Sequence, residues 1–143
     1  DDLTMGMLDI IDQYAGTDAA NLASYYSGII YLKMNDYSNS IKYLSKFNSD
    51  DILLSSLATG SIGDAFAELN QYEDAYDYYV KASKSDNNYT SPMYLYKAGL
   101  LAMRLNKFKR AEEYFTEIKK DYPNSSEAKN IDAFISKAVA SRE

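Results

Sequence analysis

Apolar side chains recur every three or four positions along almost the whole chain, which is the spacing of an amphipathic α-helix. No stretch of useful length alternates between apolar and polar residues as a half-buried β-strand would. The pattern therefore predicts an all-α fold. Eight helices are expected, joined by short turns, at about 2–14, 19–34, 37–47, 52–69, 72–84, 90–105, 108–122 and 124–140.

Residues between the expected helices indicate how each turn is made. Gly16 can adopt the left-handed conformation that follows many helices, and Asn35 tolerates it better than most residues. Residues 90–92 (Thr-Ser-Pro) predict a helix start with a hydroxyl cap and a proline in the first turn. Further on, Pro123 closes one helix, and residues 124–127 offer a start similar to a capping box for the last one.

Three segments share one pattern, in which a glycine is followed by an asparagine and then an aromatic residue. The glycines recur every 35 or 36 residues. A period in this range is typical of helical repeats, in which each unit buries its apolar face against its neighbours. The registered positions are Gly28, Gly63 and Gly99, then Asn35, Asn70 and Asn106, then Tyr37, Tyr72 and Phe108.

The unit resembles the tetratricopeptide repeat, a helix-turn-helix motif whose small residue at position 8 lets two helices approach closely. Here the glycines occupy that position, and small residues also stand at position 20. Two departures are Phe47 and Ile118, which replace the small residue of position 27, so we expect an altered superhelical twist. The matching residues at positions 20 and 24 are Ser40, Ala75 and Ala111, then Leu44, Tyr79 and Phe115.

The resemblance implies a single domain over 1–143, built as a solenoid of helical hairpins with about three full repeats. We expect the second helix of a truncated repeat at 1–17 and a polar-faced capping helix at 124–143. The three repeats are expected at 18–49, 50–88 and 89–123.

In this family the first helix of each repeat lines the concave face, so the resemblance also implies where a partner binds. The first and third repeats place mainly apolar residues there, with Lys33 and Arg104 available for acidic groups at the rim. Such a groove would take an apolar or amphipathic segment of another protein. The alternative is that several of these residues pack against the chain itself. The candidate residues are Leu22, Tyr25, Ile29, Leu32, Lys33, Met93, Tyr96, Leu100, Met103 and Arg104.

The family's carboxylate clamp, which grips chaperone C-termini, is matched at only one of its five positions, by Lys97. Chaperone-tail binding is therefore disfavoured. A narrower resemblance is to the soluble part of bacterial membrane-anchored proteins related to the ancillary factor of the Sec translocon. It rests on 8–14, 19–23 and 117–125, and it implies a periplasmic location, a missing N-terminal anchor and a role in envelope protein biogenesis.

Composition narrows the chemistry that the chain can perform. The formal net charge is −6, which argues against nucleic-acid binding. The chain has no cysteine and no histidine, so the usual nucleophile, general base and metal ligands are missing. We expect no enzyme activity, no cofactor and no metal site. No apolar run approaches the roughly 20 residues that span a bilayer, so this fragment should not insert into a membrane.

Self-assembly or tethering without a separate client is the alternative function. The truncated first unit would leave Leu3, Met7 and Ile10 uncovered, and a helix from another copy could cover them. The expected oligomeric state is a monomer or a weak homo-oligomer.

Overall fold

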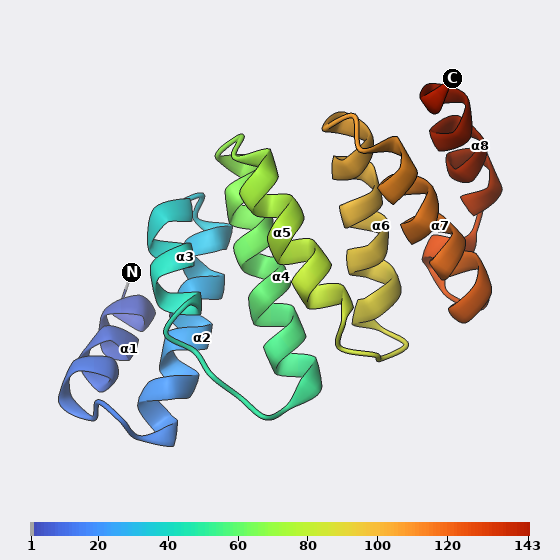
Figure 1. Ribbon diagram of the computed structural model, residues 1–143. Helices are drawn as coiled ribbons and strands as arrows, with labels where there is room; N and C mark the ends of the chain where they lie inside the picture. The colour runs from blue at the N-terminus through green and yellow to red at the C-terminus, as the bar shows by residue number, and fades with distance from the viewer. Residues whose placement is uncertain (1) are drawn as a thin grey trace.

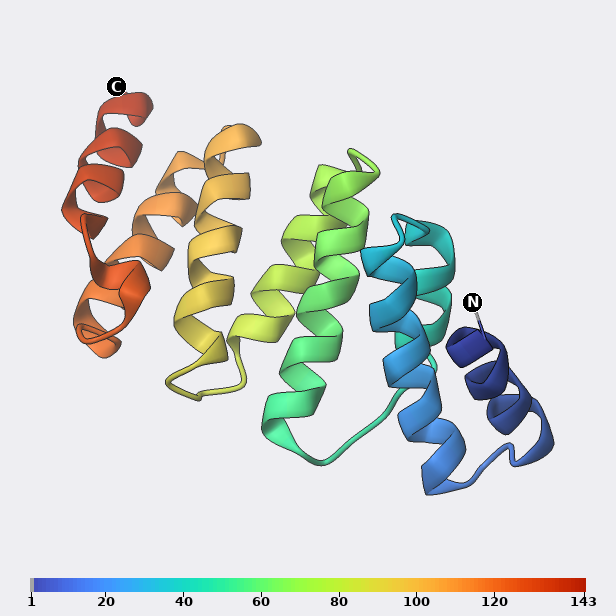
Figure 2. The same cartoon turned by 180° about the vertical axis from the view of Figure 1, so that it is seen from behind.

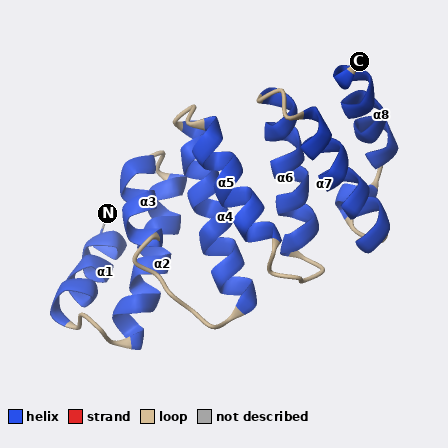
Figure 3. Cartoon of the chain, viewed as in Figure 1, coloured by secondary structure: helices blue, strands red, loops and turns tan. Residues whose placement is uncertain are grey.

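The computed structural model describes residues 2–143, and Asp1, the first residue of the predicted half repeat, lies outside them. Within this range the chain forms eight α-helices and one 3₁₀ turn, with no strand (Figure 1, Figure 3). The predicted all-α solenoid is confirmed. The elements are α1 (Asp2–Gln13), α2 (Asp18–Lys33), α3 (Tyr37–Leu44), α4 (Ile52–Glu68), α5 (Tyr72–Ser83), α6 (Thr90–Arg104), α7 (Phe108–Asp121), η1 (Ser126–Ala128) and α8 (Ile131–Arg142).

The helices stack in chain order as hairpins. α2 packs on α3, α4 on α5 and α6 on α7, while α1 covers α2 and α8 covers α7. The first helices of the three hairpins, α2, α4 and α6, lie side by side along the molecule (Figure 2). We call the surface that they form the first-helix face. None of the helices within residues 2–143 combines the length and the apolar character needed to cross a membrane.

The turn inside each hairpin is built in the same way three times. Asn35, Asn70 and Asn106 all have positive φ angles, of 61°, 59° and 59°. The amide of the residue after each asparagine then donates to a carbonyl five residues back, as Gln71 N does to Phe66 O at 2.9 Å. This is the Schellman pattern of a helix end. The predicted left-handed positions at Asn35 and Gly16 (φ 83°) are confirmed.

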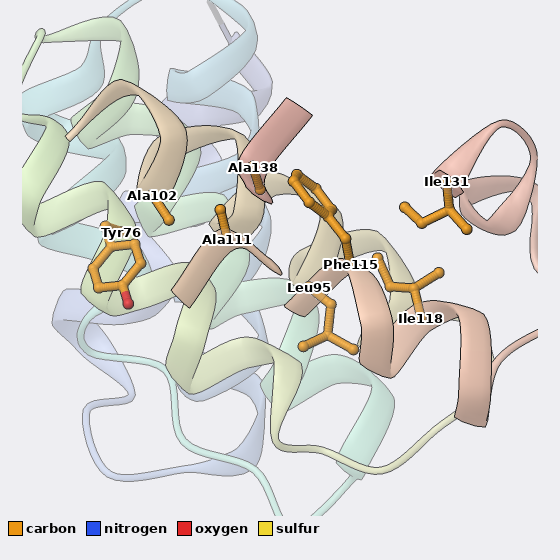
Figure 4. Packing of buried hydrophobic residues seen from close by; sticks show 8 residues of the cluster. All are labelled: Tyr76, Leu95, Ala102, Ala111, Phe115, Ile118, Ile131 and Ala138. Carbon is orange, nitrogen blue, oxygen red and sulfur yellow. The ribbon is translucent and has the colours of Figure 1, made fainter. Parts of the chain in front are cut away.

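Close approach within each hairpin depends on the registered glycines. A Cβ atom at Gly28 would lie 2.4 Å from Leu44, one at Gly63 would lie 2.8 Å from Tyr79, and one at Gly99 would lie 2.4 Å from Phe115. The facing residue is in every case position 24 of the same repeat, so the small residue and the large one fit together as the motif predicts. Phe115 is completely buried and forms the centre of the largest core cluster (Figure 4).

Two helix boundaries and the cap of one further helix differ from the predictions. α3 ends at Leu44, three residues early, because Phe47 leaves the helix and packs on Tyr25 with ring centroids 5.1 Å apart. The start of α6 is capped by Asn87, whose Oδ1 accepts from the amides of Tyr89 and Thr90, and the Thr90 hydroxyl is buried.

The third difference concerns the last helix. The Ser125 side chain caps only the short turn η1, by accepting from the Ala128 amide. Asn130 then adopts a left-handed conformation with φ of 60°. α8 therefore begins at Ile131 rather than at 124, and this break brings the Ile131 side chain into the core cluster of the third repeat.

Candidate functional site

The ten predicted binding residues fall in two groups on the first-helix face. One group lies on α2 and the other on α6, and α4 separates them. Four of the ten are exposed: Lys33, Arg104, Leu22 (41%) and Leu100 (40%). The other six are half-buried, and none is fully buried. The structure thus leaves a surface at every predicted position, but it does not bring the two groups together.

The half-buried members of the α2 group also support the core. Tyr25 and Ile29 pack against the cluster of Leu44, Ala58 and Ile62 at the junction of the first two repeats. Burial raises the pKa of the Tyr25 phenol, with a smaller contribution from the neighbouring Tyr26. The Tyr25 ring is therefore partly structural.

The α6 group shows the same division more clearly. The Tyr96 ring lies 5.3 Å from the ring of Phe134 on α8 and 6.2 Å from that of Phe115. Met103 contacts the same cluster, and Met93 packs against the cluster around Tyr79 and Tyr94. Leu100, one turn after Tyr96, is instead exposed.

Between the two groups lies a polar network that the sequence did not predict. The carboxylate Oδ1 of Asp64 accepts from the Tyr79 hydroxyl at 2.6 Å and from the Lys97 ammonium at 2.7 Å. The Lys97 Nζ atom also lies 5.5 Å from the Tyr79 ring centroid and 5.7 Å from that of Tyr94. Lys97, the one residue that matches the carboxylate clamp, is therefore already paired.

Burial raises the pKa values of Tyr79 and Tyr94. The second cause is the hydrogen bond to Asp64 at Tyr79 and the negative charge of Asp64 at Tyr94. Both phenols stay neutral at physiological pH. The one sequence signal for the network is that Asp64 and Lys97 stand about one repeat apart on successive first helices, where helical neighbours in a solenoid face one another.

A cavity of about 350 Å³ opens beside this network. Its apolar lining comes from Leu32 of α2 and Ala67 of α4, and Glu68 adds an exposed carboxylate that accepts weakly, at 3.4 Å, from the Tyr37 hydroxyl. Among the residues that line this cavity, Leu32 is the one that belongs to the ten predicted binding residues. The complete lining is Leu32, Asn35, Tyr37, Asp64, Ala67, Glu68, Tyr79 and Lys97.

The two predicted rim cations differ in how they are held. The Arg104 guanidinium lies 4.1 Å from the centroid of the Tyr72 ring, at the turn of the second repeat. Stacking of this kind fixes a guanidinium without neutralising its charge. Lys33 makes no ion pair within residues 2–143 and remains exposed. No group of three or more acidic side chains in that range could hold a metal ion.

These features define a helical-hairpin repeat protein. Tetratricopeptide repeat models match residues 60–89 and 94–125, which contain most of the second and third hairpins. The second and third hairpins are tetratricopeptide repeats. No curated protein matches it.

Proposed function

We propose that the first-helix face binds an apolar or amphipathic segment of a partner protein. Tetratricopeptide repeats are in general non-catalytic protein–protein interaction modules. The observation that carries the finer proposal is the exposure of Leu22 and Leu100, two apolar side chains at opposite ends of this face. Covering what remains exposed of each would contribute roughly 1 kcal/mol, from the 1.5–3 kcal/mol of a fully buried leucine.

The polar centre of the face supports an amphipathic partner over a wholly apolar one. The cavity beside Asp64 combines the Leu32 side chain with the exposed Glu68 carboxylate. Arg104, held by Tyr72, would anchor an acidic group of the segment at the rim. The bound segment would thus contact apolar residues at its two ends and polar ones at its middle.

A photo-crosslinking experiment tests this proposal without disturbing the core. A photoreactive amino acid is placed at Leu22 or at Leu100 of the full-length protein in its native cells, and at the exposed Met5 of α1 as control. We expect the same partner to be captured from positions 22 and 100, but not from position 5. Capture of the same unselective set of proteins from all three positions would overturn the proposal.

Two double variants that introduce negative charges complete the test. Leu22→Glu with Leu100→Glu should abolish the cross-link to the partner made from a third position, Lys33, because two carboxylates would be buried on binding. Met5→Glu with Tyr89→Glu makes the same change at two exposed apolar residues elsewhere and should leave that cross-link intact. Tyr25 and Tyr96 are unsuitable for this purpose, since both rings also pack in the core.

Self-assembly is a second candidate function, favoured by the exposed apolar side chains of α1. Met5 and Ile10 are 65% and 37% exposed. A copy-to-copy contact through α1 would give a mass that rises with concentration in light scattering, and Met5→Glu would abolish that rise. A constant monomer mass up to millimolar concentration would exclude this function for the described chain.

The role in envelope protein biogenesis at the periplasmic face of a bacterial membrane rests on the narrower resemblance alone, and we propose it on that basis. Cell fractionation of the full-length protein, with protease protection in spheroplasts, tests it. Digestion of the repeats in intact spheroplasts is the expected result, and full protection would contradict the location.

A further inference from the structure

α3 is one turn or more shorter than the second helices of the other two repeats. It has 8 residues, whereas α5 has 12 and α7 has 14. The chain then runs from residue 45 to 51 as the long loop into α4 (Figure 1). In the other repeats the residues equivalent to Phe47 are Ala82 and Ile118, which are helical and buried. The second helix of the first repeat therefore lacks the last helical turn that α5 and α7 have.

Two cavities lie at this place and share Ser55, Thr59 and Lys81. One has a volume of about 230 Å³, and the other about 380 Å³. The smaller has a mixed lining, in which the apolar residues are Leu44, Phe47, Ala58, Ile62 and Tyr78 and the polar ones are Ser45, Asn48, Ser55, Thr59 and Lys81. Because they share these residues, we treat them as one groove, between the end of α3 and α5 with α4 as its base, and call it the outer groove.

Three of the residues that line the outer groove are smaller than their equivalents at the next junction. Leu44, Ala58 and Thr59 line it. Their equivalents one repeat later are Tyr79, Tyr94 and Leu95. There the two tyrosine rings stack with centroids 6.1 Å apart, and Leu95 is buried in the core. At these three positions the second junction thus carries larger side chains than the first.

The rim of the outer groove is basic, although the chain carries a net charge of −6. Lys81 and Lys84 are exposed side chains in the last turn and cap of α5, and both line the groove. Neither makes an ion pair within residues 2–143, where five other cations do. Asp50, in the loop before α4, is the one acidic group among the lining residues.

We propose that the outer groove is a second binding site, which takes a short acidic amphipathic helix of a partner protein. The helix occupies the place of the turn that α3 lacks. One of its apolar side chains fills the cavity over Leu44, Ala58 and Ile62, and its carboxylates pair with Lys81 and Lys84. This site is separate from the first-helix face and would let the module hold two segments at once.

Fluorescence anisotropy with a defined probe tests the proposal. The probe is a fluorescein-labelled, 14-residue helical peptide with leucines at i, i+3 and i+4 and glutamates on its other face, and its twin carries lysines in place of the glutamates. We expect the acidic peptide to bind saturably and the lysine twin to bind at least ten times more weakly. Amide chemical shifts should change at residues 55–62 and 78–84. Shift changes confined to α2 and α6, or no binding at millimolar peptide, would overturn the proposal.

Two variants separate the apolar and the charged contributions. Thr59→Leu places in the groove the residue that fills the next junction, and it should weaken peptide binding at least tenfold while α-helical circular dichroism is retained. Lys81→Glu with Lys84→Glu should do the same and should favour the lysine twin. The matched control is Lys109→Glu with Lys120→Glu on the exposed side of α7, which should bind like the wild type.

Failure here is distinguishable from failure of the first-helix proposal, because Leu22→Glu with Leu100→Glu should leave the peptide affinity unchanged. If Thr59→Leu binds the acidic peptide as tightly as the wild type, the apolar cavity is not the site and the proposal is wrong. If Thr59→Leu instead removes a concentration-dependent increase in mass, the occupant is a second copy, and the separate partner is refuted.

Discussion

Replacing Gly99 by alanine gives the sharpest test of how each hairpin is held together. In α6 the added methyl group would lie 2.4 Å from Cε1 and 2.7 Å from Cζ of Phe115, whereas ordinary contacts begin near 3.4 Å. Phe115 is completely buried, and its ring also packs on Tyr96 and Phe134. The ring therefore cannot move aside, and α6 and α7 must separate by about 1 Å.

Two opposing terms set the size of the effect. Overpacking of a tight core costs about 1–3 kcal/mol, and the rigid surroundings of Phe115 place this site at the upper end. Alanine in a helix interior returns about 1 kcal/mol relative to glycine. We therefore expect Gly99→Ala to lower the free energy of unfolding by about 2 kcal/mol. For a chain of this size that corresponds to a fall in Tm of about 8 °C.

Gly6 supplies the matched control because it is the helical glycine in open space. A Cβ atom there would meet no other atom within 4 Å. Gly6→Ala keeps the propensity gain and adds no clash, so Tm should rise by about 2–4 °C, from a gain of about 0.5–1 kcal/mol. Calorimetry of both variants measures this contrast, a fall in Tm for Gly99→Ala and a rise for Gly6→Ala.

A double-mutant cycle with Phe115→Leu assigns the cost to the ring itself. The smaller side chain should remove most of the penalty of Gly99→Ala, with a coupling of about 1 kcal/mol or more. A Gly99→Ala protein that melts at or above the wild-type temperature would refute the close-packing argument. Equal costs of Gly99→Ala in the wild-type and Phe115→Leu backgrounds would show that the strain lies elsewhere.

Three further outcomes follow from the turns and the polar network. Asn70→Ala should lower stability by about 1–2 kcal/mol in urea denaturation, because φ there is 59°, while Asn70→Gly should change it little. Tyr79→Phe should flatten the loss of stability above pH 10. Burial raises the pKa of the folded-state phenol above its unfolded value of about 10. The stability that this phenol contributes is therefore present below pH 10 and falls as the pH rises. Asp64→Asn should cost less than about 1 kcal/mol because it still accepts from Tyr79, while Asp64→Ala should cost about 1–3 kcal/mol because the buried hydroxyl loses its acceptor.

Helix positions could be predicted because the same local signals appear in each repeat. An asparagine in the left-handed conformation ends each first helix, and the aromatic residue two positions later begins the second. The exceptions arise where a distant contact outweighs the local signal. Ser125 does form its capping hydrogen bond, yet the helix stops after one turn because Ile131 is drawn into the core.

The candidate site was less predictable because core and surface residues share the same helical spacing. Tyr96 and Leu100 stand one turn apart on the same stripe of α6, but α8 covers the first and not the second. Periodicity alone assigns both to one face. Which of them remains exposed depends on how far the last helix extends over α6, and that follows from the unpredicted break at Asn130.

Size differences between equivalent positions carry the information that periodicity lacks. Tyr25 and Ala58 face the first junction, and the equivalent pair at the next junction is Gly60 and Tyr94, with the large and small residues exchanged. Tyr94 reaches across to the space above Gly60, where a Cβ atom would lie 1.9 Å from its ring. Each junction thus pairs one aromatic ring with one small residue, but the ring comes from the preceding repeat in one case and from the following repeat in the other. This exchange keeps the helices in contact on the first-helix face at both junctions, and the outer groove lies beside Ala58 at the first.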